Sequence, residues 1–337
     1  MGWKMKKIFL VVLATVFFLI GCSTNDEDSV VKKINNSLND IDSYYLSGDL
    51  SIQNNDDKYN YDVEVYYKDD DFYRVNLINS ENGHEQIILK NDDGVYVVTP
   101  SLNKSFKFQS NWPKDSSQIY LLESLYEDIF NSSERIFEAN DDGFVFEVEA
   151  NYPNNSNLVK QTITFDSNLV LKNVKVYNEN NDLQMEMTFS EIIINKDIDD
   201  SIFDLNNIIS NLTGDINSGD SSVSSIDDII YPLYIPTGTV LVDEEKVNKT
   251  DGERIILTFD GEKPFILVEE TVSLDEDFEI VPMEGSPYLM LDSVASLSNN
   301  SISWINNGIE YYLVSDVMSQ IELVEIANSV TTIEYAK

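Results

Sequence analysis

Alternating apolar and polar residues are the feature that most limits how this chain can fold. In the segment Lys58–Tyr67, one side of an extended strand carries aromatic and β-branched side chains, namely Tyr59, Tyr61, Val63, Val65 and Tyr67. Successive side chains of a strand point to opposite faces, so this pattern predicts a half-buried strand with an aromatic inner face. The chain is therefore expected to build an antiparallel sheet with one covered face.

The same alternation recurs along the first two thirds of the chain. Further strands are predicted at Phe72–Leu77, Gln86–Leu89, Val95–Val98, Lys104–Phe108, Phe144–Val148, Val159–Phe165, Val170–Tyr177 and Gln184–Ile192. Apolar residues at helical spacing predict a helix over Ser29–Ile41 and another from about Ser116 to Phe130. The expected fold class is β-rich α+β, with a long antiparallel sheet and few helices.

A change in composition divides the chain. Residues 208–226 are rich in Asn, Ser, Gly and Asp, which predicts a linker between a domain at 29–207 and a smaller α+β domain at 227–337. The length of 337 residues also favours about two domains. In the second domain, we expect strands at Val240–Val247, Arg254–Phe259, Pro264–Val272, Ser301–Ile305 and Ile309–Val314, then a helix at Asp316–Ser329.

The first residues have the layout of an export signal. Lys4, Lys6 and Lys7 precede an apolar run from Ile8 to Ile20, which is shorter than the roughly 20 residues that a spanning helix needs. The run ends in Leu19-Ile20-Gly21-Cys22, which resembles the lipobox of bacterial lipoproteins. This resemblance implies a signal peptide at 1–21, diacylglycerol on Cys22, a further acyl chain such as palmitate on the new amine, and a tether at 22–28. The protein would then be lipid-anchored at the extracytoplasmic face of the cell membrane.

The charge and the residue inventory exclude several classes of function. The chain has 22 Lys+Arg against 60 Asp+Glu, a net charge of −38, which argues against a nucleic-acid partner. A single Cys and a single His, His84, argue against a disulfide framework, a Cys/His metal site and a Ser-His-Asp triad. Sixty acids form many pairs by chance, so no carboxylate pair stands out. We expect no catalysis, no cofactor and no metal.

One acidic stretch has the spacing of a calcium loop. In Glu138–Glu149, Gly143 falls at position six and Glu149 at position twelve. However, Phe144–Ala150 alternates as a strand, which cannot supply the second helix of that motif. The stretch is therefore predicted to be a β-hairpin.

The inner faces of the predicted strands leave two possibilities open. Their apolar side chains form either an ordinary core or the wall of a cavity in a sheet that curls without closing, and Met suits a cavity that adapts to variable acyl chains. The candidate cavity residues are Tyr61, Val63, Val65, Tyr73, Val75, Met185, Met187 and Phe189.

Residues 26 to about 207 resemble the LolA/LolB/RseB superfamily of lipoprotein-handling domains. The stretches that carry the resemblance are Tyr61–Lys68, Phe72–Val75, Gln86–Pro100, Phe165–Val176, Met187–Asn195 and Asn195–Phe203. The resemblance implies an incompletely closed antiparallel β-barrel, with helices covering an apolar cavity, that binds acyl chains or a protein and performs no catalysis. The arginine that locks the lid of the carriers has no counterpart at Lys68–Asp71.

The second domain resembles a small module of lipoproteins from endospore-forming Gram-positive bacteria. The matching stretches are Tyr231–Gly238, Trp304–Gly308, Tyr311–Leu313 and Glu322–Ser329. The combination implies a sporulation or germination lipoprotein.

Two hypotheses of function follow. The first is a membrane-anchored, non-catalytic module that binds an envelope protein or a cell-wall enzyme, which predicts an exposed apolar or aromatic patch. The alternative is a carrier or sensor of lipoprotein acyl chains or lipid, which predicts an open apolar cavity in the barrel.

Overall fold

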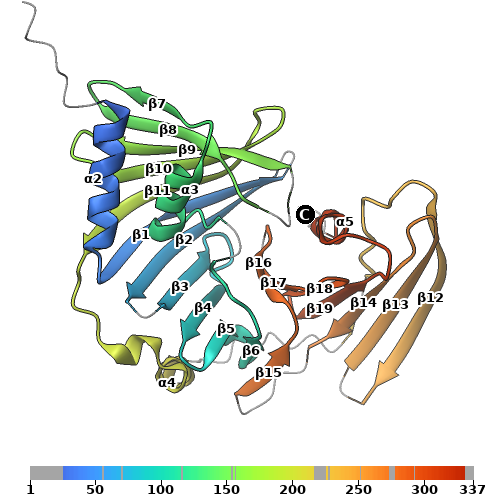
Figure 1. Ribbon diagram of the computed structural model, residues 1–337. Coiled ribbons are helices and arrows are strands. Elements are labelled where there is room, and N and C mark those ends of the chain that lie inside the picture. Colours follow the sequence, from blue (N-terminus) through green and yellow to red (C-terminus); the bar gives the residue numbers. More distant parts are fainter. Residues whose placement is uncertain are drawn as a thin grey trace, which may run out of the picture.

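The computed structural model describes residues 26–330, except 55–56, 70, 115–116, 153–154, 156, 216–224, 227, 251, 273–277 and 292. The predicted signal peptide and Cys22 lie outside the described residues. The described part of the chain forms a large curled sheet and a smaller sheet that packs against its open side (Figure 1).

The large sheet has twelve strands in the order β15-β6-β5-β4-β3-β2-β1-β11-β10-β9-β8-β7. Their bounds are β1 (Ser43–Asn54), β2 (Asp57–Lys68), β3 (Phe72–Asn79), β4 (Glu85–Asn91), β5 (Gly94–Thr99), β6 (Lys104–Phe108), β7 (Ile136–Ala139), β8 (Gly143–Glu149), β9 (Leu158–Asp166), β10 (Leu171–Asn178), β11 (Leu183–Ile194) and β15 (Glu279–Met283). The end strands β7 and β15 are not paired with each other, so the sheet curls without closing. The predicted fold class, an incompletely closed β-barrel followed by a smaller unit, is confirmed.

Two helices cover the inner face of the large sheet. Helix α2 (Glu27–Asn39) contributes Val30 and Ile34 to the main core, and α3 (Leu122–Asn131) contributes Leu125 and Ile129. Helix α2 begins two residues before the expected start, because the Asp26 side chain accepts a hydrogen bond from the backbone N–H of Ser29 at 2.9 Å and caps the helix. Helix α3 begins at Leu122, later than the apolar spacing indicates.

A second layer covers part of the outer face. Ile198, Phe203 of the short helix η2 (Asp200–Phe203) and Ile208 of α4 (Leu205–Asp215) form a small core with side chains of β4 and β5. Both faces of these two strands are therefore buried, which explains why their sequences are continuously apolar. Helix α4 overlaps the first residues of the expected linker at 208–226, and Ile208 is buried.

The smaller sheet has seven strands in the order β12-β13-β14-β19-β18-β17-β16. Their bounds are β12 (Thr239–Lys249), β13 (Gly252–Gly261), β14 (Phe265–Thr271), β16 (Ser286–Leu289), β17 (Val294–Leu297), β18 (Ser301–Asn306) and β19 (Ile309–Val314). Helix α5 (Gln320–Asn328) packs on one face and shares a core with Leu257, Trp304 and Tyr311. We call this sheet with α5 and the preceding segment from residue 225 the C-terminal unit.

The two units are joined more closely than two domains on a linker would be. Strand β15 leaves the C-terminal unit and pairs in parallel with β6 at the edge of the large sheet. The connection between β16 and β17 then enters the mouth of the large sheet. There the hydroxyl of Tyr61 donates a hydrogen bond to the backbone oxygen of Leu291 at 2.8 Å, and the N–H of Val294 donates to Gln86 Oε1 at 2.7 Å.

Strand β1 is central to the large sheet although the alternation pattern did not reveal it. Gly48 interrupts its apolar face, and the pairing with β11 shifts register between Ser47 and Gly48. A Cβ at Gly48 would lie 2.2 Å from the backbone oxygen of Thr188, so only glycine allows β11 to approach this closely.

We expect the substitution Gly48→Ala to lower the free energy of unfolding by about 1–3 kcal/mol, because the added methyl group forces β1 and β11 apart. Ser51→Ala on the same strand is the control and should have little effect. Urea unfolding followed by circular dichroism measures both. Equal stability of the two variants would show that β11 can yield at this position.

Candidate functional site

The eight residues predicted to line a cavity lie together on the inner face, and none is more than 9% exposed. They belong to one core cluster with α3 and with Leu291 and Val294 of the C-terminal unit. Met185 lines a cavity, whereas the other seven side chains pack within this core. The open space therefore lies toward the mouth of the sheet and not along the strands' inner faces, because helices and the β16–β17 connection fill the interior.

Aromatic rings occupy the inner face beside α3. Tyr67 packs against Tyr44 and Tyr73 with ring centroids 5.0 Å apart in each pair, and Trp112 meets Tyr73 edge-on at 5.8 Å. The Tyr44 hydroxyl donates a hydrogen bond to Glu123 Oε2 at 2.8 Å, and burial raises the pKa of Glu123 to about 7. The hydrogen bond to this carboxyl group thus joins α3 to strand β1 of the large sheet.

A cavity of about 310 Å³ lies at the junction of the two units. The large sheet contributes Ile52, Ile88 and Met185, and the loops around Trp112 and Tyr152 form one side. Residues of β16 and one side of α5 form the other side, and α5 faces the large sheet in Figure 1. We call this space the junction cavity.

Few charged groups but many polar ones line the junction cavity. The hydroxyls of Ser110 and Ser286 are 2.8 Å apart and link the two units at its wall. Among the described residues, the Tyr152 hydroxyl and Asn328 Oδ1 are buried and have no hydrogen-bond partner. Alternation patterns could not identify these two residues, because the cavity is formed by loops and by the end of a helix.

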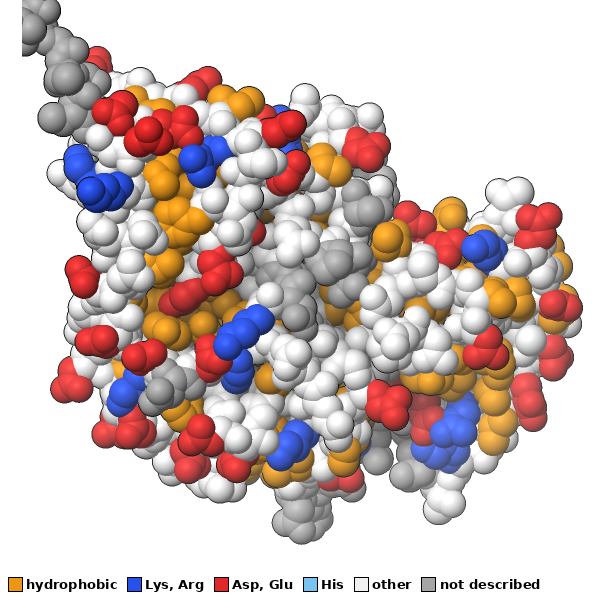
Figure 2. Space-filling model, in the orientation of Figure 1, with side chains coloured by type: hydrophobic (Ala, Val, Ile, Leu, Met, Phe, Trp, Pro, Cys, Tyr) orange, Lys and Arg blue, Asp and Glu red, His pale blue; other side chains and the backbone are white. Residues whose placement is uncertain are grey.

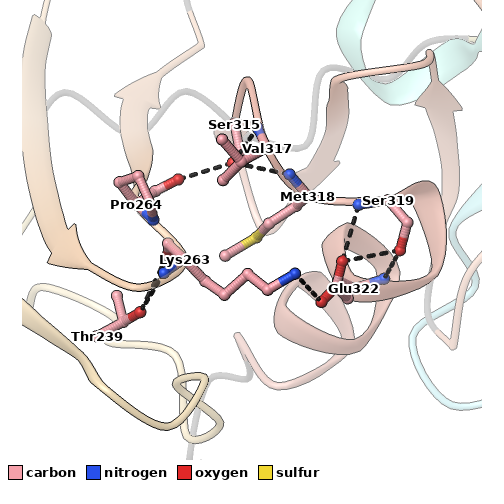
Figure 3. A network of polar contacts seen from close by, with 8 residues as sticks. All are labelled: Thr239, Lys263, Pro264, Ser315, Val317, Met318, Ser319 and Glu322. Atoms are coloured by element: carbon pink, nitrogen blue, oxygen red, sulfur yellow. Dashed lines mark hydrogen bonds and ion pairs between the residues drawn. The ribbon is translucent and has the colours of Figure 1, made fainter.

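A polar network fixes α5, and with it one wall of the junction cavity (Figure 3). Ser319 Oγ caps the helix through the N–H of Glu322, whose carboxylate in turn accepts a hydrogen bond from the N–H of Ser319 at 2.9 Å. Lys263, in the turn after β13, pairs with Glu322 at 2.9 Å. The N–H of Ser319 is the first cause of a lowered pKa of Glu322, and the Lys263 ammonium is the second. The ion pair with Lys263 ties the helix to the smaller sheet.

The segment Tyr231–Ile235 exposes four large apolar side chains: Tyr231 43%, Leu233 70%, Tyr234 45% and Ile235 37%. Pro232 and Pro236 are buried, so the chain is held on either side of three consecutive exposed apolar residues, Leu233–Ile235. We call this segment the apolar loop. Its spacing of prolines and aromatic residues was visible in the sequence, but its exposure was not.

Backbone hydrogen bonds hold the apolar loop in place. The N–H of Leu233 donates to the oxygen of Ser329 at 3.0 Å, and the N–H of Tyr234 donates to Ser329 Oγ at 3.0 Å. Just before the loop, the N–H of Ile230 donates to Glu269 Oε1 at 3.0 Å. The loop is thus fixed to both α5 and β14.

Acidic groups border the apolar loop. The Tyr231 hydroxyl donates a hydrogen bond to Glu244 on the edge strand β12 at 2.7 Å, and the exposed Asp243 and Glu245 flank Glu244. Val240 and Val242, near the start of β12, are 60% and 55% exposed. In Figure 2, acidic side chains are spread over both units and hydrophobic atoms reach the surface of the C-terminal unit.

The remaining candidate sites have no grouping that suggests chemistry. Glu138–Glu149 forms the hairpin of β7 and β8, where Asn140 Oδ1 accepts hydrogen bonds from the N–H groups of Asp142 and Gly143. His84 is exposed in a turn. Within the described ranges, no three His, Cys, Asp or Glu side chains gather as a metal site would require. No helix in the same ranges has the length and apolar character needed to cross a membrane.

These features define the class of protein: an open, curled β-barrel whose mouth is closed by a second β-rich unit. The family model "Sporulation protein YdcC-like" matches residues 4–203. The chain is also 34% identical over 330 residues, 97% of both chains, to "Sporulation protein YdcC" of Bacillus subtilis. The chain belongs to the sporulation protein YdcC-like family, which confirms the expected link to sporulation.

The chain also matches solved structures at low sequence identity. The structure of the MucA/MucB complex of Pseudomonas aeruginosa matches with a TM-score of 0.32 and 13% identity, over 90% of this chain and 97% of that chain. A LolA superfamily protein from Nitrosomonas europaea matches with a TM-score of 0.31 and 14% identity, over 52% of this chain and 98% of that chain.

We expect Glu269→Gln to flatten the dependence of stability on pH. Glu269 is fully buried, and burial raises its pKa from 4.5 to about 7. Between these values the folded protein holds a proton that the unfolded chain has lost, so the free energy of unfolding falls as pH rises. Glutamine keeps an acceptor for the N–H of Ile230 but does not titrate.

Urea unfolding at pH 5 and pH 8 tests this expectation. The exposed Glu262→Gln is the matched control and should keep the pH dependence of the unchanged protein. If the free energy of unfolding fell as much between pH 5 and pH 8 in Glu269→Gln as in the control, the buried proton would not belong to Glu269.

Proposed function

We propose that this protein is a lipid-anchored, extracytoplasmic and non-catalytic binding module that acts in sporulation by contacting an envelope protein or a cell-wall enzyme. The observation that carries the proposal is the apolar loop. Four large apolar side chains are exposed within five consecutive residues, up to 70% for Leu233, and grouped exposure of this kind marks a surface that a partner covers.

The apolar loop is suited to protein contact. Its backbone is held by Ser329 and its prolines are buried, so little conformational entropy is lost on binding. Tyr side chains are common anchors at interfaces because they combine a large apolar area with a hydroxyl group. The acidic border at Asp243–Glu245 favours a partner whose apolar pocket is flanked by Lys or Arg.

The proposed anchor is Cys22. The sequence places it five residues before the start of α2 at Glu27, so a lipid on Cys22 would hold the large sheet close to the membrane surface. The negative charge of the chain opposes flat adsorption to anionic lipid, which leaves the C-terminal unit free to meet another protein.

The alternative function, carriage or sensing of acyl chains inside the barrel, receives less support. The inner face is packed by α3, by aromatic rings and by Leu291, and Met187 and Val65 are fully buried. An acyl chain would have to displace this packing at the cost of the apolar contacts that hold the two units together. We therefore favour protein contact.

We expect Leu233→Asp to abolish capture of the partner in sporulating cells while the protein still folds and accumulates. A charged group in place of an exposed apolar anchor removes buried area and adds a desolvation cost, which weakens binding at least tenfold. Val170→Asp, at a position 41% exposed in the β9–β10 turn, is the matched control. Each variant is assayed by co-purification after in-cell crosslinking.

A photo-crosslinking residue identifies the contact directly. Placed at Tyr234, it should capture one specific protein. Placed at Tyr312, which is 43% exposed on the face of the smaller sheet that α5 does not cover, it should capture none. Equal capture from both positions, or none from Tyr234, would count against the apolar loop as the contact surface.

We expect Cys22→Ala to shift the protein from the membrane fraction to the soluble or unprocessed fraction, because no acyl chain can attach without the thiol. Ser23→Ala serves as control. Fractionation and mass spectrometry of the N-terminal peptide measure the outcome, and an unmodified Cys22 in mature wild-type protein would refute the anchor.

A further inference from the structure

The junction cavity is a second candidate site, separate from the apolar loop. Its volume of about 310 Å³ lies at the lower end of the range of about 300–1,000 Å³ that is usual for small-molecule sites. Both units contribute walls, and the α5 wall is fixed by the Ser319–Glu322 cap and by Lys263. A ligand there would contact both units at once.

Two buried polar atoms in the cavity lack a partner in the described part of the chain. The Tyr152 hydroxyl comes from the β8–β9 loop, and Asn328 Oδ1 comes from the last turn of α5. Buried polar atoms are nearly always hydrogen-bonded, and an unpaired one costs roughly 1–3 kcal/mol. Asn328 Oδ1 needs a donor, while the Tyr152 hydroxyl can donate to an acceptor.

The charges around the cavity limit the ligand further. Among the described residues that line it, none is Lys, Arg or His, and the one charged side chain is Glu325. A phosphate, a fatty-acid carboxylate or an anionic headgroup would find no cation and would meet an acid. A purely apolar molecule would leave the Tyr152 and Asn328 atoms unpaired.

Aromatic rings and amide side chains remain as the recognition groups. Trp112, Tyr120 and Tyr288 lie at the wall, as do Gln53 and Gln184. Flat rings suit the C–H face of a sugar, and amides suit hydroxyl groups, because each amide offers both a donor and an acceptor. An acetamido group adds a methyl for the apolar wall, an N–H for Asn328 and a carbonyl oxygen for Tyr152.

We propose that the junction cavity binds an uncharged, N-acetylated glycan, held by the Tyr152 hydroxyl and Asn328 Oδ1 between the two units. The ligand provides hydrogen-bond partners for these two polar atoms and couples the C-terminal unit to the large sheet. None of the five residues of the apolar loop lines this site.

Isothermal titration calorimetry tests the proposal with chitotetraose as the probe and the full-length protein in lipid nanodiscs. We expect saturable binding at one site, and roughly tenfold weaker binding for Tyr152→Phe, which removes only the hydroxyl, and for Asn328→Leu. Tyr96→Phe is the matched control, since its hydroxyl meets the backbone oxygen of Asp93 outside the cavity; it should bind like the unchanged protein.

The following results would overturn the proposal. Absence of saturable heat with chitotetraose would do so, as would unchanged affinity in both Tyr152→Phe and Asn328→Leu. Binding of laurate, inorganic phosphate or end-blocked tetra-alanine in place of the sugar would assign the cavity to a lipid, an anion or a peptide. Circular dichroism and unfolding midpoints of all variants establish that they are folded.

Discussion

The structure depends on how the inner face of the curled sheet is covered. Its apolar and aromatic side chains need shielding from water, and burial at roughly 25 cal/mol per Å² makes that covering the main source of stability. Helices α2 and α3 cover one part, and the β16–β17 connection covers the mouth through Leu291 and Val294. The hydrogen bond from Tyr61 to the oxygen of Leu291 fixes that closure inside the core. The C-terminal unit is thus a structural part of the barrel as well as a separate sheet.

Much of the fold could be predicted because period-two alternation is a direct consequence of strand geometry. Strands whose apolar face is interrupted could not be predicted from this period. In β1, Gly48 removes a side chain from the apolar face so that β11 can approach. In β15–β17, Pro282, Gly285 and several Ser residues interrupt the alternation. The position of β15 is set instead by its pairing with the distant strand β6. Such tertiary constraints are not encoded in a local window.

The candidate sites were less predictable than the fold. Alternation correctly puts Tyr61, Val65 and Met187 on one buried face, but it cannot tell whether another segment fills the space before them. Leu291 helps to fill this space, and it is more than 200 positions away from Tyr61 along the chain. Likewise, the prolines of the apolar loop were legible in the sequence, whereas the outward direction of Leu233 depends on contacts with Ser329. Family membership confirms the sporulation context that the resemblance of the second domain implied.

A filled interior and an exposed apolar loop together favour contact with a protein over carriage of lipid. The most direct test of the filled interior is native mass spectrometry of the full-length protein, incubated in nanodiscs with a bacterial lipid extract and then released. We expect the mass of the chain, together with the N-terminal lipid if the proposed anchor at Cys22 is present, and no further lipid. A stoichiometric additional lipid that survives release would contradict this expectation, since such a ligand requires space where Met187 and Leu291 are packed.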